Sequence, residues 1–315
     1  DMENKSLKQI IANRLEKLDK IRQLGVNPYP YEFNATHSTS DITKDKVDKK
    51  VSVAGRVMSL RKMGKAAFAN IQDAHGRVQL YIARDDVGED NYSLFKLVDI
   101  GDFIGIDGVV FITKTDELTV KAENVTMLSK NLRPIPDVKE KDGEKYNSVS
   151  DKELRYRKRY LDMIINPETK DNYIKRFKII NSIREFLNKN GYIEVETPVL
   201  QPVYGGANAK PFKTFHHALD QEFFLRIATE LYLKQLIVGG FEKVYEMSKD
   251  FRNEGIDRSH NPEFTMLEFY QAYADYNFMM DFVEEMFKKV ATDLGVKKIS
   301  WDGNNIDLSK KFARR

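Results

Sequence analysis

The sequence predicts an α+β protein built from more than one domain. Between residues 51 and 133 it consists mainly of short β-rich runs. From about residue 171 onward, helical periodicity alternates with strand-like runs, and two of these strands flank a polar loop. A length of 315 residues exceeds one ordinary domain, and a hydrophobic fraction of 41% is enough for sizeable cores.

Composition excludes several classes of protein. The chain has no cysteine, which excludes disulfides, thiol catalysis and thiolate metal sites. No apolar run approaches the ~20 residues of a membrane span, and no signal-peptide pattern opens the sequence. We therefore expect a cytoplasmic protein. The net charge of only +3 says little about partners, and the five histidines lack zinc-site spacing.

Residues 1–50 are expected to form an N-terminal basic helix and a linker. Apolar residues recur at helical spacing: Leu7, Ile11, Leu15, Leu18 and Ile21. Basic residues surround that stripe: Lys8, Arg14, Lys17, Lys20 and Arg22. Gly25 is a plausible C-terminal cap. Two interpretations stay open, an ordinary amphipathic helix with solvated lysines and a helix that contacts phosphates.

Residues 51–135 are expected to form an OB-fold barrel. Five strands are predicted, at 51–58, 66–73, 77–83, 103–113 and 118–127, with a short helix at 91–99. A helix after the third strand is the order typical of that fold, which often binds single-stranded nucleic acid across its second and third strands. A charged, solvated connector is expected at 136–160.

Two residues on the second and third barrel strands have the chemistry to read a base. Phe68 could stack on a base and Gln79 could bond a base edge, while Arg61, Lys62 and Lys65 before them could hold phosphates. Spacing alone favours simpler roles, a core phenylalanine and a solvated glutamine.

Residues 161–315 begin with a helix predicted from about Asp171 to Asn190. Its predicted inward face is formed by Ile174, Phe177, Ile180, Ile183, Phe186 and Leu187. A strand follows and ends near Pro198. Further along, Thr229 is a candidate N-terminal cap for a helix whose first turn contains Glu230.

The stretch from 246 to 270 carries the most specific pattern. Alternate residues share a strand face, which predicts two polar rows: Glu246, Ser248, Asp250 and Arg252, then Phe264, Met266, Glu268 and Tyr270. Unpaired charge is costly in a core, so these rows suit the floor of a pocket for a ligand that carries phosphate, an aromatic base and a cation. The alternative is a surface hairpin with solvated charges.

Three segments of the sequence resemble the class II aminoacyl-tRNA synthetases. FRNEG at 251–255 and HNPEFTMLEFYQAYADY at 260–276 resemble motif 2, in the form found in bacterial-type lysyl-tRNA synthetases. The helix and strand that end at Pro198 resemble motif 1. MGKAAFANIQD with RVQLYIARDD resembles the anticodon-binding domain of lysyl-, aspartyl- and asparaginyl-tRNA synthetases. The resemblance implies an OB-fold followed by part of an antiparallel-sheet catalytic domain.

The resemblance also implies a nucleotide site. Arg252 would be catalytic, since it would neutralise the α-phosphate of ATP in the transition state. Glu254 would accept a hydrogen bond from the adenine amino group, and Phe264 would stack on the ring. His260 and Asn261 would touch the nucleotide from the loop, whereas Arg258 is given no role.

A lysine site is implied next to it, made of Gly206, Glu230, Glu268 and Tyr270. Two buried carboxylates repel each other unless a cation lies between them, and a lysine substrate supplies that cation. An aspartyl- or asparaginyl-type enzyme, the first alternative, needs a positively charged pocket instead.

In the barrel, the resemblance implies that Phe68, Gln79 and Glu117 hold the central uridine of a tRNA anticodon, with Arg61 nearby. The family usually has glycine where Asp116 stands, so the turn before Glu117 is expected to differ.

The implied activity is that of a lysine–tRNA ligase. Lysine and ATP would form lysyl-adenylate, and the lysyl group would pass to the 3′ end of tRNA(Lys) in a homodimer assembled through motif 1. Mg²⁺ would arrive with ATP, and no metal ligands are expected in this chain. We find no motif 3, so we expect a fragment with little or no activity alone. The second alternative is a non-catalytic tRNA-binding product.

Overall fold

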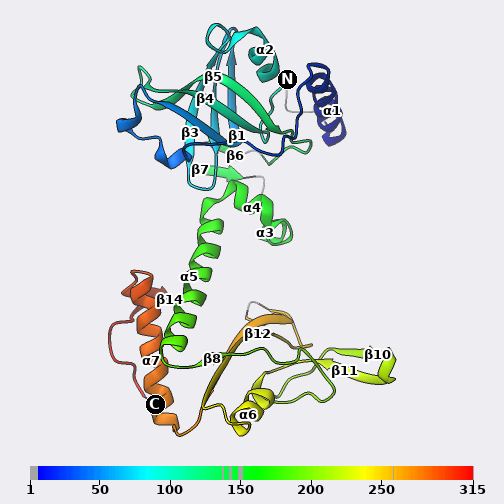
Figure 1. The fold of residues 1–315 in the computed structure, drawn as a ribbon, viewed down its shortest axis with the longest axis vertical. Helices are drawn as coiled ribbons and strands as arrows, with labels where there is room; N and C mark the ends of the chain where they lie inside the picture. The colour runs from blue at the N-terminus through cyan, green and yellow to red at the C-terminus, as the bar shows by residue number, and fades with distance from the viewer. Residues whose placement is uncertain (1–5, 137, 142–143, 148–151, 258, 315) are drawn as a thin grey trace. The chain divides into compact units, whose positions relative to one another are not determined.

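The computed structural model describes residues 6–136, 138–141, 144–147, 152–257 and 259–314. The chain divides into two compact units, Asp1–Ile165 and Asn166–Arg315 (Figure 1). Both units combine helices with β-sheets, so the α+β prediction is confirmed. Among the described residues, no helix is long and apolar enough to cross a membrane.

The first unit contains a closed five-stranded barrel in the order β1-β2-β3-β5-β4. Its strands are β1 (Lys50–Met63), β2 (Ala66–Gln72), β3 (Arg77–Ala83), β4 (Phe103–Ile112) and β5 (Leu118–Ser129). Among the barrel strands, only β3 and β5 pair in parallel. The helix α2 (Arg84–Lys96) follows β3 and begins earlier than the predicted residue 91, bending at Gly88, whose φ is +82°.

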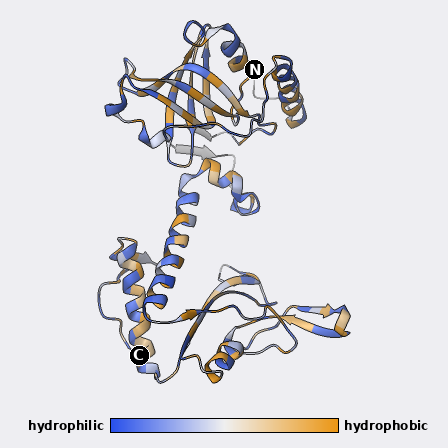
Figure 2. Ribbon diagram, in the orientation of Figure 1, coloured by the Kyte–Doolittle hydropathy of each residue, from blue (hydrophilic) through white to orange (hydrophobic). Residues whose placement is uncertain are grey.

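Apolar and polar residues alternate along the barrel strands, so that one face of each strand points into the core. In β2 and β3 every second residue is buried, and Figure 2 shows the strands alternating in hydropathy. Ala67 and Ala69 point into the core, which leaves Phe68 half-buried on the outer face. The core interpretation of Phe68 is therefore wrong.

The helix α1 (Leu7–Gln23) packs on the barrel through Leu18 and Ile21, both of which are buried. Ser6 and Gln9 form a capping box at its start, and Gly25, with φ +73°, follows its end. Arg14 donates hydrogen bonds to the carbonyl oxygens of Ile100 at 3.0 Å and Asn131 at 2.9 Å.

The basic stripe of α1 is therefore partly used inside the protein. Besides Arg14, Lys17 pairs with Asp99. Lys20 and Arg22 remain on the surface in pairs with Glu16 and Asp19 of the same helix.

The remaining elements of the first unit are short. They are the 3₁₀ turns η1 (Thr39–Asp41) and η2 (Lys44–Lys46), the hairpin β6 (Val138–Lys141) and β7 (Glu144–Asn147), and the helices α3 (Lys152–Arg157) and α4 (Arg159–Ile165). Arg155 and Arg159 pair with the buried Asp162 at 2.8 and 3.1 Å. This part of the expected connector thus has helical structure of its own, while 137, 142–143 and 148–151 lie outside the described residues.

The second unit contains two small three-stranded sheets. One has the order β13-β12-β8 and the other β10-β11-β9. The strands are β8 (Ile193–Glu194), β9 (Leu200–Gln201), β10 (Lys213–His216), β11 (Gln221–Leu225), β12 (Lys243–Phe251), β13 (Glu263–Gln271), β14 (Lys298–Trp301) and β15 (Asn304–Asp307). The helices are α5 (Pro167–Lys189), η3 (His217–Leu219), α6 (Glu230–Val238) and α7 (Tyr276–Asp293).

Aromatic side chains from α5, α7 and the β12–β13 sheet form the core of the second unit. It consists of Phe186, Leu187, Tyr192, Tyr245, Phe282 and Met286. Burial, together with the carboxylate of Glu194, which accepts a hydrogen bond from the phenol, raises the pKa of Tyr245 to about 12.

The predicted inward face of α5 is correct only near its C-terminal end. Phe186 and Leu187 are buried and Ile183 packs against them, but Ile174 and Phe177 are 42% and 61% exposed. The core residues contributed by α7 meet only the last turns of α5. The predicted inward placement of Ile174 and Phe177 is therefore wrong for this chain.

We expect a large loss of barrel stability when Lys130 is replaced by methionine. Its fully buried ammonium pairs with Asp99 at 2.6 Å and with the fully buried Asp102 at 2.7 Å. Removing one partner of a buried pair leaves an uncompensated charge, so Lys130→Met should lower the free energy of unfolding by about 3–5 kcal/mol in urea titrations. Lys50→Met is the matched control.

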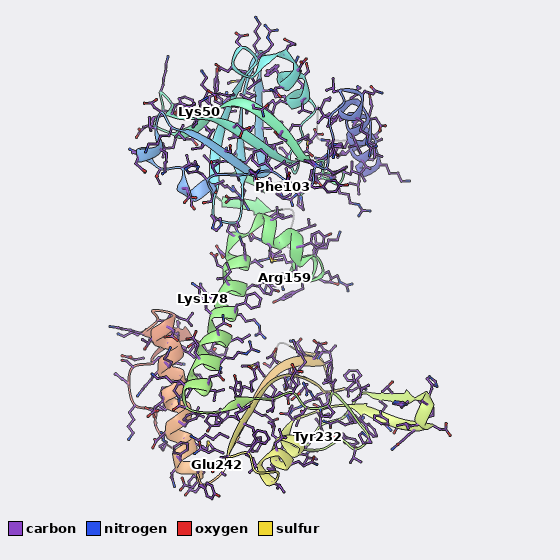
Figure 3. All side chains as sticks on the ribbon, in the orientation of Figure 1. Lys50, Phe103, Arg159, Lys178, Tyr232 and Glu242 are labelled. Carbon is purple, nitrogen blue, oxygen red and sulfur yellow. The ribbon has the colours of Figure 1, made fainter. Side chains whose placement is uncertain are left out.

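Lys50, labelled in Figure 3, pairs with Glu123 at 3.0 Å while both side chains are exposed, so its replacement should cost under about 1 kcal/mol. Burial favours a higher pKa for Asp99, but hydrogen bonds from Lys130 and Lys17 hold that pKa below its usual value. The stabilisation is therefore present above the unfolded pKa of about 3.9 and should fade as pH falls. Equal losses for the two variants would contradict this account.

Candidate functional site

The antiparallel pair β12–β13 carries the polar rows of the second unit. Glu246 lies opposite Glu268, Ser248 opposite Met266 and Asp250 opposite Phe264. Residues directly opposite in an antiparallel pair share a face, so both predicted rows lie on the same side of the sheet.

Arg226, which the sequence patterns did not single out, lies against that face. Its guanidinium is 2.7 Å from the carboxylate of Glu246 and 3.3 Å from that of Asp250. It also donates to the carbonyl oxygens of Thr197 and Lys249, each at 3.0 Å. Glu246 and Asp250 are therefore buried and paired with Arg226. The signal in the sequence was an arginine directly after the apolar run of β11.

The carboxyl group of Asp250 is in a strained electrostatic position. Burial raises its pKa, the nearby charges of Glu268 and Glu246 raise it further, and Ser248 and Arg226 lower it. Its Oδ2 atom is buried and has no hydrogen-bond partner among the described residues. The single guanidinium of Arg226 thus pairs with two carboxylates, those of Glu246 and Asp250, while the charge of Glu268 lies nearby.

Glu230, Glu268 and Tyr270 lie together at the start of α6. The Tyr270 hydroxyl donates to Glu268 at 3.1 Å, and the backbone N–H of Thr229 approaches the other Glu268 oxygen at 3.4 Å. Burial raises the pKa of the Tyr270 phenol, and the negative charges of Glu268 and Glu230 raise it further. Both carboxylates are therefore within electrostatic reach of the same hydroxyl group.

Gly206 packs directly on Glu230. Its φ of +86° favours glycine, and a Cβ at this position would lie 2.9 Å from the Cβ of Glu230. In this structure Glu230 pairs with Lys234, one turn along α6, at 2.5 Å. All four predicted lysine-site residues thus lie around the start of α6.

Thr229 occupies the predicted N-cap position of α6, but without the side-chain hydrogen bond of a cap. Its own backbone is helical, with φ −98° and ψ −5°, and its side chain makes no capping hydrogen bond. The hydroxyl oxygen is buried and has no partner among the residues that the structure describes.

Arg252 and Phe264 lie together beside the same segment. The Arg252 guanidinium is 5.1 Å from the centre of the Phe264 ring, and it reaches the carbonyl oxygen of Ile227 at 3.5 Å. Its Nε atom is buried without a partner in the described part of the chain. The segment 227–230 therefore touches Arg252 at one end and carries Glu230 at the other.

Glu254, His260 and Asn261, the nucleotide-contacting residues predicted after β12, form no hydrogen bond or ion pair with Arg252 or Phe264 in the portion of the chain that the structure describes. Glu254 accepts a hydrogen bond from the backbone N–H of Lys210 at 3.3 Å. The exposed His260 ring lies 2.8 Å from Asp257, and Asn261 is exposed beside it. Arg258 lies outside the described residues.

In the barrel, the structure gathers the four predicted anticodon residues around one hollow of about 410 Å³. Its lining is formed by Ser59, Leu60, Arg61, Phe68, Asn70, Gln79, Thr113, Thr115 and Glu117. The centres of the Phe68 and Tyr81 rings are 5.1 Å apart, and this contact holds Phe68 in one wall of the hollow.

Gln79 and Glu117 bond each other across this hollow. The Gln79 amide nitrogen donates to the Glu117 carboxylate at 2.7 Å, so the glutamine is not merely solvated. Asp116 adopts a φ of +60°, a left-handed conformation that glycine also adopts easily. The turn is closed by a hydrogen bond from the Thr113 N–H to the Glu117 carbonyl oxygen at 3.0 Å.

Comparison with known proteins bears on both units. Residues 151–315 match the family model of class II tRNA synthetases (D, K and N), and residues 51–128 match that of the OB-fold nucleic acid binding domain. The chain belongs to the class II tRNA synthetases. The predicted OB-fold and class II sheet domain are thereby confirmed.

The relatives that this class II synthetase chain matches include three lysine–tRNA ligases. It is 49% identical to that of Carboxydothermus hydrogenoformans over 99% of this chain and 64% of the relative. It is 51% identical to that of Pelotomaculum thermopropionicum over 98% and 60%. It is 50% identical to that of Thermoanaerobacter pseudethanolicus over 98% of this chain and 61% of the relative. The chain thus spans less than two thirds of the length of these relatives.

We expect Asp250→Asn to change how stability depends on pH. The folded-state pKa of Asp250 is raised above its ordinary value of 3.8. Its protonated form therefore stabilises the fold below that value, and this contribution is lost as pH rises through the raised pKa. Urea titrations from pH 4 to 7 should show the wild-type protein losing stability relative to the variant as pH increases. A constant difference, or one of opposite slope, would overturn this assignment.

Proposed function

We propose that this chain belongs to a lysine–tRNA ligase, which activates lysine with ATP as lysyl-adenylate and transfers it to the 3′ end of tRNA(Lys). The observation that carries the proposal is that Glu230 and Glu268 lie together at the start of α6. Glu268 accepts hydrogen bonds from the Tyr270 hydroxyl and the Thr229 N–H. The Lys234 ammonium that pairs with Glu230 lies 6.0 Å from the centre of the Tyr270 ring. Two carboxylates in one site suit a substrate with a free ammonium group. The names of the relatives support the same substrate.

The lysine site proposed here consists of Gly206, Glu230, Glu268 and Tyr270. Glu230 is occupied by Lys234, but this pair lies within one helix and the lysine side chain is 56% exposed. Such a pair contributes only about 0.3–0.5 kcal/mol, so the ammonium of a substrate could replace it at small cost. Gly206 lets the backbone approach Glu230 closely and leaves no side chain in the site.

The nucleotide site proposed here is centred on Arg252 and Phe264. Arg252 would face the α-phosphate, and the unpartnered Nε supports an unfilled role as a donor. Phe264 would stack on adenine, and Glu254 would accept from the adenine amino group. His260 and Asn261 would reach the nucleotide after the contact between His260 and Asp257 is exchanged.

The reaction requires no nucleophile from the protein. The lysine carboxylate attacks the α-phosphorus and pyrophosphate leaves, after which the tRNA 3′-hydroxyl attacks the activated carbonyl. Position and charge stabilisation by groups such as Arg252 would supply the rate enhancement. Within the described ranges, no cluster of three or more His, Asp or Glu side chains is arranged to hold a metal ion. Mg²⁺ is therefore proposed only as the companion of ATP.

The hollow in the barrel would bind the anticodon of tRNA(Lys), with Phe68 stacking, Gln79 and Glu117 reading the central uridine, and Arg61 near the phosphates. The exposed apolar residues of α5, including Ile174 and Phe177, would pair with a second copy through motif 1. We propose the cytoplasm as its compartment, because charged tRNA is used there.

The amino acid can be tested directly by amino-acid-dependent pyrophosphate exchange on a full-length protein that contains these residues. Lysine should stimulate exchange and aspartate or asparagine should not. Glu268→Gln should raise the KM for lysine by about tenfold or more, since a hydrogen bond to a charged group contributes about 1.5–3 kcal/mol. Glu285→Gln, an exposed glutamate of α7, is the control and should change nothing.

Stimulation by aspartate or asparagine with no response to lysine would replace the proposal with the aspartyl or asparaginyl alternative. RNA binding without any amino-acid-dependent exchange would favour the non-catalytic alternative.

A further inference from the structure

Thr119 lies behind the barrel hollow and is not part of its lining. It is fully buried on β5, directly opposite Gln79 in the parallel pairing of β3 and β5. Its hydroxyl donates a hydrogen bond to the side-chain oxygen of Gln79 at 2.9 Å, and it lies 3.2 Å from the carbonyl oxygen of Glu117. A buried hydroxyl with such partners holds a neighbouring group in one orientation.

The two ends of the Gln79 amide have different partners. Glu117 decides which end faces the hollow, because a carboxylate only accepts hydrogen bonds, and the Thr119 hydroxyl holds the opposite end as its donor. The oxygen faces Thr119, and the nitrogen donates to the Glu117 carboxylate at 2.7 Å. The reversed amide would bring its oxygen against a carboxylate oxygen, which is repulsive. The nitrogen of Gln79 is therefore the end presented to the hollow, and it retains a second N–H for a ligand.

The two partners differ in how firmly they are held. Glu117 follows the exposed turn at Asp116, whereas Thr119 is fixed by the strand pairing and by complete burial. A base that donates a hydrogen bond to the Glu117 carboxylate would compete with Gln79 for that acceptor and weaken one of the two restraints on the amide. Thr119 would then be the firmer restraint on the amide.

We propose that Thr119 is a positioning residue that keeps the Gln79 amide nitrogen directed at the base and so makes the hollow prefer uracil over cytosine. The proposal rests on the anticodon role proposed above. Uracil offers a carbonyl acceptor to the amide nitrogen and an N3–H donor to the Glu117 carboxylate. Cytosine offers an amino donor and an N3 acceptor at those positions, so both contacts would be mismatched.

Without the Thr119 hydroxyl, the amide can rotate and present its oxygen to the cytosine amino group. Thr119→Val keeps the shape and the strand preference of threonine but removes the hydroxyl. We expect the preference for uracil to fall by about tenfold, within the range that one well-made base contact contributes. Thr119→Ser keeps the hydroxyl and should restore the preference.

The test measures binding of the 315-residue chain to an RNA hairpin of anticodon stem–loop size with uracil at the centre of its loop, and to the same hairpin with cytosine there. Thr126→Val is the matched control, because Thr126 lies on the same strand opposite Gly105 and outside the hollow. It should leave the ratio of the two affinities unchanged. Thermal unfolding identifies variants that fail to fold, and Thr119→Ala provides a second removal of the hydroxyl.

Two failures are distinguishable. If the wild-type chain binds both hairpins equally, the proposed anticodon role fails and this inference fails with it. If the wild-type chain prefers uracil and the folded Thr119→Val and Thr119→Ala variants keep that preference, the anticodon role survives and the positioning role of Thr119 is overturned. Loss of the preference in Thr119→Val, with recovery in Thr119→Ser, supports the proposal.

Discussion

The second unit depends on the buried guanidinium of Arg226. It satisfies Glu246 and Asp250 while bonding the carbonyl oxygens of Thr197 and Lys249. A buried charge is tolerated only when it is paired and its hydrogen bonds are met, and the Arg226 guanidinium is paired with two carboxylates and bonded to two carbonyl oxygens. Its backbone adds two further contacts, since its N–H bonds the Val199 carbonyl oxygen and its carbonyl oxygen accepts from the N–H of Phe251, each at 2.9 Å.

These contacts position the candidate site, because the residues that follow Arg226 form its centre. The Ile227 carbonyl oxygen meets Arg252, the Thr229 N–H meets Glu268, and Glu230 begins α6. The proposed nucleotide and lysine sites lie on either side of this short segment, which would bring the two proposed substrates close together. Such proximity is what a reaction without a protein nucleophile requires.

The barrel differs from the second unit in the composition of its core. Its core is almost entirely apolar, and the residues proposed to bind the anticodon lie on β1, β2 and β3 and on the turn before β5. There the polar groups restrain one another, as Gln79 does with Glu117 and Thr119. The geometry of the hollow is thus set by strand register and a few hydrogen bonds.

Local patterns in the sequence predicted the elements that depend on local forces. Apolar alternation located the barrel strands to within a few residues, except for β1, which continues to Met63 beyond the predicted end at 58. The helix α5 was predicted, but Phe177 was placed wrongly because periodicity does not reveal how far a packing partner extends. Arg226 and Thr119 could not be found, since their roles depend on partners that the fold brings together across the chain. The family resemblance supplied Glu117, which spacing alone would not single out.

The ion pairs of Arg226 hold the segment 227–230 in place. The most direct measurement is hydrogen–deuterium exchange of the backbone amides in Arg226→Met, with the barrel amides as an internal reference. We expect amides 227–230 of this variant to exchange at least about tenfold faster than in the wild-type protein, while those of the barrel are unchanged. Unchanged protection at 227–230 would contradict it.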